Sequence, residues 1–488
     1  MNALMDCPRS CRDMKTLFFL LSLASAAVAA GKPNIIYILA DDLGYGDIGC
    51  YGQKTLTTPN IDRMAAEGMK FTRHYAGDTV CAPSRCVLMT GLHTGHCRVR
   101  GNDPWIIDDN DLTVPKLLRS AGYHTACLGK YGLGKPLPLD DPQRKGFDEF
   151  FGYLGTSHAH NFYTKALIRN GAIVHLPNTV IPGSFKDAKD YADSDLVGTG
   201  VAPLEGRKAW APQLIADDVQ RYLGERAAAK QPFFLYYALN IPHTNNEAGK
   251  SSPLGHGMEC PDYGEFKNRD WPDVEKGFAQ FIRFLDNEVG RVISRLKDLD
   301  IADHTLVMFA SDNGPHHEGG HDSAFFNSNG DFKGIKRDMT DGGIRVPFIA
   351  WWPGKIKAGS VSEHVSGFQD LMPTVADLSG AQITAETDGV SFMPTLLGKD
   401  GQKQHSHLYW SLNEQGGKTA VLRWPWKLIH LNTGASSKNA KKQAKPKPLV
   451  KLLYNLETDV GEEKNLAAEK PELVAELEQL MQSSWRAP

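Results

Sequence analysis

Oxygen-bearing side chains follow two apolar segments of this sequence. Asp41 and Asp42 come directly after NIIYILA, and Asp312 and Asn313 follow TLVMFA and one serine. Carboxylate and amide oxygens suit a hard divalent cation such as calcium or magnesium better than zinc. Adjacent aspartates at a strand end are also common helix caps, so neither pair alone is decisive. Taken together, the two pairs predict a metal site.

The stretch CAPSRCVLMTG begins at Cys81 and sets a proline two residues and an arginine four residues after this cysteine. A buried free thiol, or half of a disulfide with Cys86 or Cys97, does not need these neighbours. A zinc site is a further alternative, but the spacing of its possible ligands is irregular. Those ligands would be Cys81, Cys86, His93, His96 and Cys97.

Apolar runs that alternate with helical patterns predict an α/β fold around a parallel sheet. Three runs, 34–40, 233–241 and 305–310, read as buried strands, and each ends at polar residues. Ligands of open α/β sheets bind outside the carboxyl ends of the strands, so these polar residues should lie together. Apolar residues of 273–299 recur at spacings of three and four, which predicts a helix packed on the sheet.

The pattern changes near residue 395. HLYWSL, TAVLRWPWKLIHL and VKLLYNLE are typical of antiparallel strands, and PELVAELEQLMQSSW of an amphipathic helix. We therefore expect a large domain over 31–395 and a smaller α+β subdomain over 396–488. Within the latter, the lysine-rich segment 432–448 predicts a mobile loop, with a polyanion-binding arm as the alternative.

The first 30 residues place basic side chains before LFFLLSLASAAVAA, which ends in small residues. This pattern predicts a signal peptide and export to the periplasm or the exterior. The alternative, a membrane anchor, would need an apolar run of roughly 20 residues, and this run is shorter. A net charge of −3 argues against a nucleic-acid partner. The cysteines beyond residue 30 permit disulfides, but a chain with a large core does not need them.

CAPSRCVLMTG resembles the signature of the formylglycine-dependent sulfatases, in which the cysteine of a CxPxR core is oxidised to an aldehyde before folding. GYHTACLGK resembles the family's second signature. The resemblance continues through ILADDLGYGD, IPHT, FASDNGP, GIKRDMTDGGIRVP, WKLI, LYNLETD and NLA, in that order. It implies an alkaline-phosphatase-like fold, hydrolysis of a sulfate ester, and a maturation enzyme that recognises Pro83 and Arg85.

The resemblance also implies roles for individual residues. The metal, usually calcium in this family, would be bound by Asp41, Asp42, Asp312, Asn313 and the formylglycine at Cys81. Arg85 would hold the formylglycine hydroxyls, Lys130 would contact the sulfate, and Lys336 would reach the sulfate or the leaving oxygen. His243 would protonate the leaving alcohol, a task that suits an imidazole. The alternative for each cation is an ordinary surface charge, and for His243 a loop residue.

One position departs from the family pattern. Many members read GKWH at the second signature, whereas this chain continues from Lys130 with Tyr131 and Gly132. The histidine often assigned to hydroxyl deprotonation and sulfate release is therefore missing. Either another histidine enters the site or this elimination step is slow. The candidates are His96, His158, His160 and His317, and Ser157 with His158 resembles a pair that lines the pocket in relatives.

The substrate is suggested by the stretch from GPHHEGG to MTDGG and by GKYGLG. Both resemble exported bacterial sulfatases that act on sulfated sugars, including galactose and N-acetylgalactosamine sulfates, and the aromatic residues of the first would suit stacking on a sugar. We therefore expect a carbohydrate sulfate, small or polymeric. The alternatives are a phosphomonoesterase or phosphodiesterase of the same superfamily, and an inactive carbohydrate-binding homologue whose cysteine stays unmodified.

Overall fold

The computed structural model describes residues 31–102, 106–135, 140–182, 200–246, 252–434 and 447–487. The predicted signal peptide, and residues 435–446 of the lysine-rich segment, lie outside them. Of the helices in the described part of the chain, none is both long enough and apolar enough to cross a membrane.

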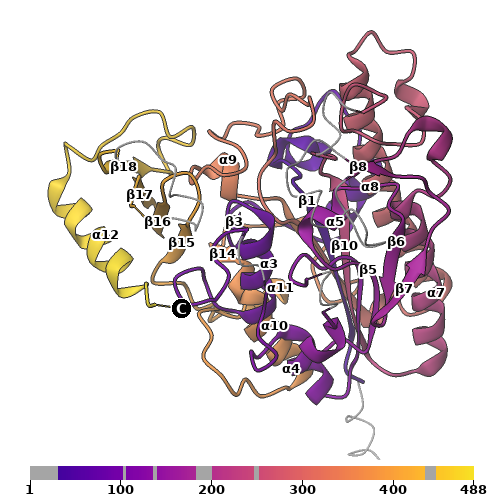
Figure 1. The fold of residues 1–488 in the computed structure, drawn as a ribbon. Helices are drawn as coiled ribbons and strands as arrows, with labels where there is room; N and C mark the ends of the chain where they lie inside the picture. The colour runs from indigo at the N-terminus through magenta and orange to yellow at the C-terminus, as the bar shows by residue number, and fades with distance from the viewer. Residues whose placement is uncertain are drawn as a thin grey trace, which may run out of the picture.

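A ten-stranded mixed sheet forms the centre of the fold (Figure 1), in the order β13-β2-β12-β11-β1-β10-β4-β5-β6-β7. The three predicted strands are its neighbouring central strands, since β1 pairs in parallel with both β10 and β11. Two further strands, β4 and β5, extend the parallel part beyond β10. These five are β1 (Asn34–Asp41), β4 (His124–Lys130), β5 (Glu149–Tyr153), β10 (Phe233–Pro242) and β11 (Thr305–Ser311). The α/β fold class is confirmed.

Helices cover both faces of this sheet because its central strands are apolar on both sides. In β1, Ile35 and Leu39 face one helical layer, and Ile36 and Ile38 face the other. The first layer contains α3 (Cys81–Thr90), α4 (Val114–Ser120), α10 (Leu371–Ser379) and α11 (Met393–Leu396). The second contains α2 (Pro59–Glu67), α7 (Ala211–Ala229) and α8 (Asp273–Asp298). The last of these is the helix predicted over 273–299.

The remaining elements are short, and the sequence patterns did not predict them. At the two ends of the large sheet lie β2 (Met69–Phe71), β12 (Phe348–Trp351), β13 (Ser360–Ser362), β6 (Ala166–Arg169) and β7 (Ala172–His175). Outside it lie β3 (His74–Tyr75), β14 (Ser366–Gly367), β8 (Ile181–Pro182), β9 (Gly200–Val201), α5 (Thr156–Ala159) and α9 (Asp341–Ile344). Two to four residues are too few to show a hydrophobic period.

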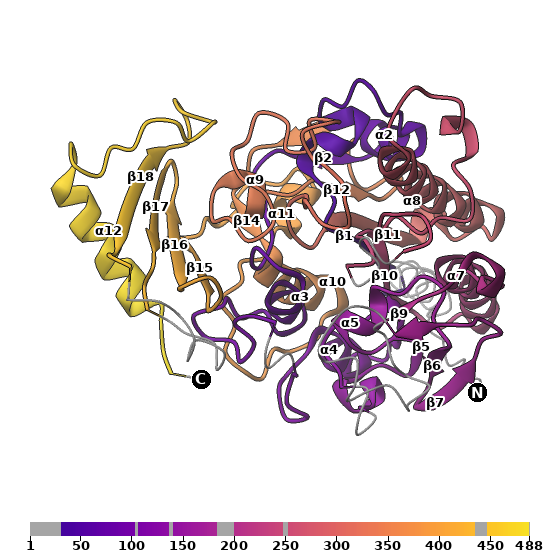
Figure 2. The ribbon, with the colours of Figure 1, turned by 45° about the horizontal axis from the view of Figure 1, so that its top comes forward.

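A small antiparallel sheet follows near the C-terminus, as predicted. Its strands are β15 (Leu408–Leu412), β16 (Lys418–Arg423), β17 (Trp426–Leu431) and β18 (Val450–Asn455), in sequence order. One face packs on α12 (Pro471–Ser483), which lies on the side away from the large sheet (Figure 2). The other face, with Trp410 and Leu422, packs on Tyr75, Val80 and Ile344 from the main body. The small sheet is therefore joined to the rest of the molecule by an apolar interface.

A buried ion network crosses the same interface. Lys427 of β17 is fully buried, and its Nζ lies 2.6 Å from Asp341 Oδ1 and 2.7 Å from Glu462 Oε1. Asp341 also accepts from Arg345 Nη1 at 3.1 Å and from Tyr75 OH at 3.3 Å. Because Asp341 begins α9, this network attaches the small sheet to the loop that precedes α9.

Candidate active site

Four parallel strands end at the same edge of the large sheet, and each delivers a polar residue there. Asp41 is the last residue of β1 and Lys130 the last of β4, while His243 and Asp312 directly follow β10 and β11. All four side chains are buried. The expectation that residues following the predicted strands meet at one place is therefore confirmed for Asp41, His243 and Asp312.

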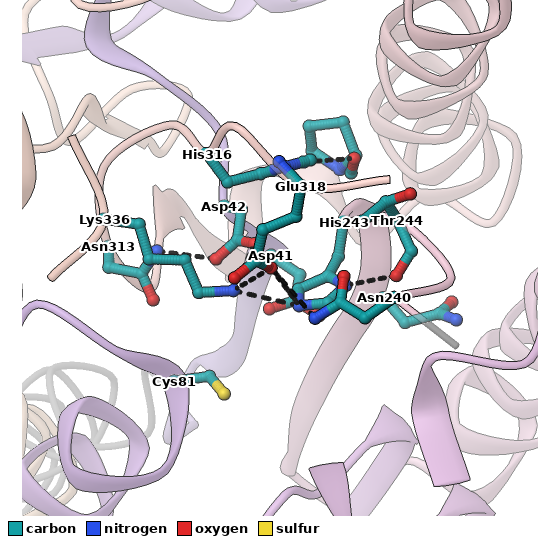
Figure 3. Close-up of polar contacts among 12 residues, drawn as sticks. Asp41, Asp42, Cys81, Asn240, His243, Thr244, Asn313, His316, Glu318 and Lys336 are labelled. Atoms are coloured by element: carbon teal, nitrogen blue, oxygen red, sulfur yellow. Dashed lines mark hydrogen bonds and ion pairs between the residues drawn. The ribbon is translucent and has the colours of Figure 1, made fainter. Parts of the chain in front are cut away.

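The oxygen-bearing residues form one contiguous cluster (Figure 3). Asp42 has a left-handed backbone, φ 65°, which directs its N–H to Asp312 Oδ1 at 3.1 Å. Asn313 Nδ2 donates to Asp42 Oδ1 at 2.7 Å. Asp41 Oδ1 and Asn313 Oδ1 are buried and accept no hydrogen bond from any described residue. Buried oxygens without donors are costly in a folded protein, so these two atoms fit the role of cation ligands.

The charges of the cluster also indicate a cation site. Burial and the neighbouring Asp41 raise the pKa of Asp312 to about 7, because carboxylates crowd together away from water. Burial would also raise the pKa of Asp41, but Lys130, His243 and Arg85 outweigh it and hold this pKa far below its usual value. Ligand atoms of Asp41, Asp42 and His243 lie within 4.8 Å of one another. The oxygens of Asp41, Asp42, Asp312 and Asn313 fit a hard divalent cation, whereas both ring nitrogens of His243 already have hydrogen-bond partners.

Three buried cations hold these carboxylates in place. Arg85, on α3, bonds Asp312 Oδ2 through Nε at 2.9 Å and Nη2 at 2.8 Å. Lys130 Nζ donates to Asp41 Oδ2 at 2.7 Å. Lys336 Nζ donates to Asp42 Oδ2 at 2.8 Å. The alternative that these three are surface charges is wrong, because each is buried within the site.

Cys81 is the first residue of α3 and is buried beside the cluster (Figure 3). Burial raises the pKa of its thiol, so the unmodified side chain is a protonated and poor nucleophile. All cysteines in the described residues are free thiols, which excludes the Cys86 and Cys97 disulfides from this structure. Among the described residues, the groups able to hold a metal contain no cysteine, so the zinc alternative finds no support.

His243 has a defined tautomer in this arrangement. Its Nδ1 lies 2.6 Å from the Thr244 carbonyl oxygen and is therefore the donor. Its Nε2 accepts from Lys336 Nζ at 3.1 Å. Burial and the adjacent Lys336 lower the pKa of His243 far below its usual value, so the ring is neutral here. The alternative of an ordinary loop residue does not fit this buried, doubly bonded ring.

The structure explains why position 132 is glycine. Gly132 has a φ of 75°, and a Cβ there would lie 3.1 Å from Arg85 Cδ. A histidine would therefore strain the backbone and crowd the arginine that bonds Asp312. Of the four replacement candidates, His160 is brought to the site, where its ring stacks on His243 at 4.4 Å.

The other three candidates have partners elsewhere. His96 bonds Asp388, and His317 bonds the Ser323 backbone. His158 lies 2.9 Å from the Ala166 carbonyl oxygen, and Ser157 next to it is exposed.

Sequence reasoning missed several residues that surround this site. Glu318 accepts from Lys336 Nζ at 2.8 Å, and the ring of His316 lies 5.7 Å from that of His243. Asn102 Oδ1 lies 3.8 Å from Cys81 Sγ. The polar run HHEGG signals the first two, because it directly follows SDNGP, whereas nothing local marks Asn102.

Oxygen atoms that could bind a divalent cation lie together with two buried lysines and the start of a helix, an arrangement that fits a hydrolase acting on a small anionic group. A family model described as Sulfatase matches residues 33–381, and one described as N-sulphoglucosamine sulphohydrolase, C-terminal, matches 332–485. N-acetylgalactosamine-6-sulfatase of Canis lupus familiaris is 33% identical over 407 residues, which cover 78% of this chain and 70% of that protein.

Arylsulfatase A of Bos taurus is 32% identical over 486 residues, which cover 93% of this chain and 87% of that protein. The crystal structure of Ps i-CgsB in complex with k-i-k-neocarrahexaose is 26% identical, with a TM-score of 0.71 over 93% of each chain. The chain belongs to the sulfatase family and is a sulfuric ester hydrolase.

Proposed function

We propose that this sulfatase hydrolyses the sulfate ester of a sulfated sugar, using a formylglycine formed from Cys81 and a divalent cation, calcium or magnesium. One observation carries the proposal: Cys81 at the start of α3 lies beside the four oxygen ligands and the buried cations at one edge of the sheet. A sugar substrate is supported by the names of two similar proteins, one an N-acetylgalactosamine-6-sulfatase and one in complex with a neocarrahexaose.

The cation would be held by Asp41, Asp42, Asp312 and Asn313, with the modified residue 81 as a further ligand. When bound, it would neutralise the sulfate and polarise its oxygens. Lys130 and Lys336 would then turn from Asp41 and Asp42 toward the sulfate, because the cation satisfies these carboxylates. Both lysines are buried, so their interaction with the anion is little screened by water.

Residue 81 performs the covalent steps in this proposal. One hydroxyl of the hydrated aldehyde attacks sulfur, and the bond between sulfur and the sugar oxygen breaks. The second hydroxyl would then lose its proton to water as the bond from carbon to the sulfate oxygen breaks, which would release sulfate and form the aldehyde again. Water hydrates it for the next cycle. Arg85, which bonds Asp312, would hold the two hydroxyls.

His243 would protonate the sugar oxygen from Nε2. In this structure Nε2 accepts from Lys336 Nζ and carries no proton, so the ring would take up a proton from water once Lys336 turns toward the sulfate. The Thr244 carbonyl oxygen fixes Nδ1 as a donor, so Nε2 is the atom that exchanges a proton with the leaving group.

The decisive experiment joins mass spectrometry to an assay. Protein made in a host with the maturation enzyme should show a mass loss at residue 81 that matches conversion of cysteine to formylglycine. It should hydrolyse 4-nitrophenyl sulfate faster than 4-nitrophenyl phosphate. Faster phosphate hydrolysis would favour the phosphoesterase alternative. An unmodified, inactive protein would favour the carbohydrate-binding homologue.

Removal and return of the metal should change stability as well as activity. Calcium or magnesium added to chelator-treated protein is expected to stabilise it by about 2.7 kcal/mol at 100 times the dissociation constant. Asn313→Ala should weaken this response, because it removes one of the two buried oxygens without donors. Thermal unfolding with the metal alone measures both effects.

The control for the metal is a group of side chains away from the site that could also hold a cation, His93, His96 and Asp388. His96→Gln should respond to the metal like the unchanged protein. A metal response that disappears in His96→Gln and survives in Asn313→Ala would contradict the ligand assignment.

Loss of His243 should depend on the leaving group. His243→Asn is expected to lower kcat about 10²-fold or more for a sugar sulfate, and much less for 4-nitrophenyl sulfate, whose leaving group needs little protonation. Steady-state kinetics on both substrates tests this. His317→Gln is the control, because His317 bonds Ser323 instead of the site. Equal losses on the two substrates would indicate a role in binding.

We also propose that residues 1–30 direct export of the chain and that the maturation enzyme acts on residues 81–85. Removal of the leader should leave the protein in the cytoplasm of the producing cell, which cell fractionation measures. Export of the truncated chain would contradict the first proposal.

A further inference from the structure

A line of polar side chains runs from the nucleophile to the residues around His243. It consists of Asn102, Glu414, Arg337, Glu318 and Asn246, and we call it the rim arc. Its members come from separate segments, and Glu414 lies in the turn between β15 and β16 of the small sheet. The rim arc therefore joins the two sheets at the active site.

Contacts connect the first half of the rim arc to residue 81. Cys81 Sγ lies 3.8 Å from Asn102 Oδ1. The Asn102 backbone N–H donates to Glu414 Oε1 at 2.9 Å. Glu414 Oε2 lies 3.7 Å from Arg337 Nε. The turn of the small sheet is thus two contacts away from the nucleophile.

The second half reaches the catalytic lysine. Arg337 Nη1 donates to Glu318 Oε1 at 2.6 Å. Glu318 Oε2 accepts from Lys336 Nζ at 2.8 Å and from Asn246 Nδ2 at 3.0 Å. Lys336 in turn contacts His243 and Asp42 (Figure 3). The rim arc therefore ends at the residues that would handle the leaving oxygen.

Arg337 at the middle of the rim arc is fixed at its backbone. Its φ is 77°, a left-handed value that is unfavourable for arginine. Its N–H donates to the Thr79 carbonyl oxygen at 3.0 Å, and its own carbonyl oxygen accepts from Lys418 Nζ of β16 at 2.6 Å. A residue with a strained backbone whose N–H and carbonyl oxygen are both hydrogen-bonded marks a position where side-chain placement matters.

The rim arc carries more negative than positive charge. Its one cation, Arg337, faces two carboxylates. Lys336, which also pairs with Glu318, would turn to the sulfate when substrate binds. The side chains of Arg337, Glu318 and Glu414 are 30%, 18% and 24% exposed, so a ligand can reach them. Carboxylates accept hydrogen bonds from hydroxyl groups and repel anions.

We propose that the rim arc selects the sugar: Glu318 and Glu414 accept hydrogen bonds from hydroxyls of the ring that bears the sulfate, and disfavour a neighbouring sulfate or carboxylate. This inference rests on the proposed function and adds the substrate class, a monosulfated sugar whose neighbouring groups are uncharged. Of these two residues, Glu318 bonds Lys336, and Glu414 belongs to the turn of the small sheet.

The test uses three probes: the galactose or N-acetylgalactosamine monosulfate that is cleaved fastest, the same sugar with a second sulfate at a neighbouring position, and 4-nitrophenyl sulfate. The unchanged enzyme should prefer the monosulfate to the disulfate by about tenfold or more in kcat/KM, because like charges meet at the rim arc. Glu414→Gln, which removes one charge and keeps the shape, should reduce this preference several-fold.

Arg337→Met should have the opposite effect and increase the preference, because it leaves the two carboxylates without their cation. General damage to the fold would lower all rates together and would not move the two variants in opposite directions. Glu476→Gln is the matched control, since Glu476 pairs with Arg423 on the exposed side of the small sheet.

The outcomes separate this inference from the proposed function. If the enzyme hydrolyses 4-nitrophenyl sulfate and cleaves the monosulfate and the disulfate equally well, the inference is overturned and the proposed function stands. The inference would also be overturned if Glu414→Gln and Arg337→Met changed the preference for the monosulfate in the same direction and by the same amount. Failure to hydrolyse any sulfate ester would contradict the proposed function and this inference with it.

Discussion

Cys81→Ala is expected to lower kcat by about 10⁴-fold or more, the scale on which enzymes lose activity with their covalent nucleophile. The Cys81→Ser protein should stop after one sulfate transfer, because a serine has a single hydroxyl and cannot expel sulfate by forming an aldehyde. Turnover of 4-nitrophenyl sulfate and the mass of the intact protein measure both effects. Serine protein exposed to substrate should gain the mass of one sulfate.

The control is another buried cysteine of the same helix. Cys86→Ala removes a similar thiol, and Cys86 contacts the core instead of the site. It should retain activity and lose only some stability, as truncation of a small buried group does. Repeated turnover by Cys81→Ala or Cys81→Ser at the rate of Cys86→Ala would contradict the formylglycine assignment.

Lys427→Met is expected to lower the free energy of unfolding by about 3–5 kcal/mol, because it leaves Glu462 buried without a cation and Asp341 with Arg345 alone. Burial raises the pKa of Glu462 to about 7 even with Lys427 present. A group with a raised pKa in the folded state destabilises it as pH rises through that pKa. The loss should therefore be larger at pH 8 than at pH 5.5, where Glu462 takes up a proton.

Urea unfolding of the variant and the unchanged protein at both pH values measures this. Lys451→Met is the matched control, since its Nζ pairs with Glu478 and its side chain is 42% exposed. An exposed pair contributes less than about 1 kcal/mol, with little dependence on this pH range. Similar losses in the two variants would contradict a stabilising role for the buried network.

The long periodic segments were predictable from the sequence, and the short elements were not. The strands of residues 34–40, 233–241 and 305–310 have continuous apolar runs, which only a strand buried on both faces tolerates in a parallel sheet. The strands at the sheet ends are three or four residues long, and β2, β12 and β13 pair with strands distant in sequence. Such pairing is a tertiary property that a local pattern does not contain.

The same distinction applies to the site. Asp41 and Asp312 were predictable because each ends a recognisable strand, and the family motifs indicated Arg85, Lys130, His243 and Lys336. Asn102 and Glu414 were not predictable, because a loop and a turn more than 300 residues apart meet through a backbone hydrogen bond. The structure supplies what the motifs omit, which is the surface around the sulfate.

The complete burial of α3 sets a time limit on maturation. Every residue from Cys81 to Thr90 is buried once the chain has folded, including the proline and arginine that a maturation enzyme would recognise. On the proposed mechanism, oxidation of Cys81 would therefore have to compete in rate with folding, and a chain that folds first would keep its thiol. The active fraction of a preparation would then depend on the relative rates of modification and folding, so slower folding or a later arrival of the enzyme would change specific activity without any change in the folded structure.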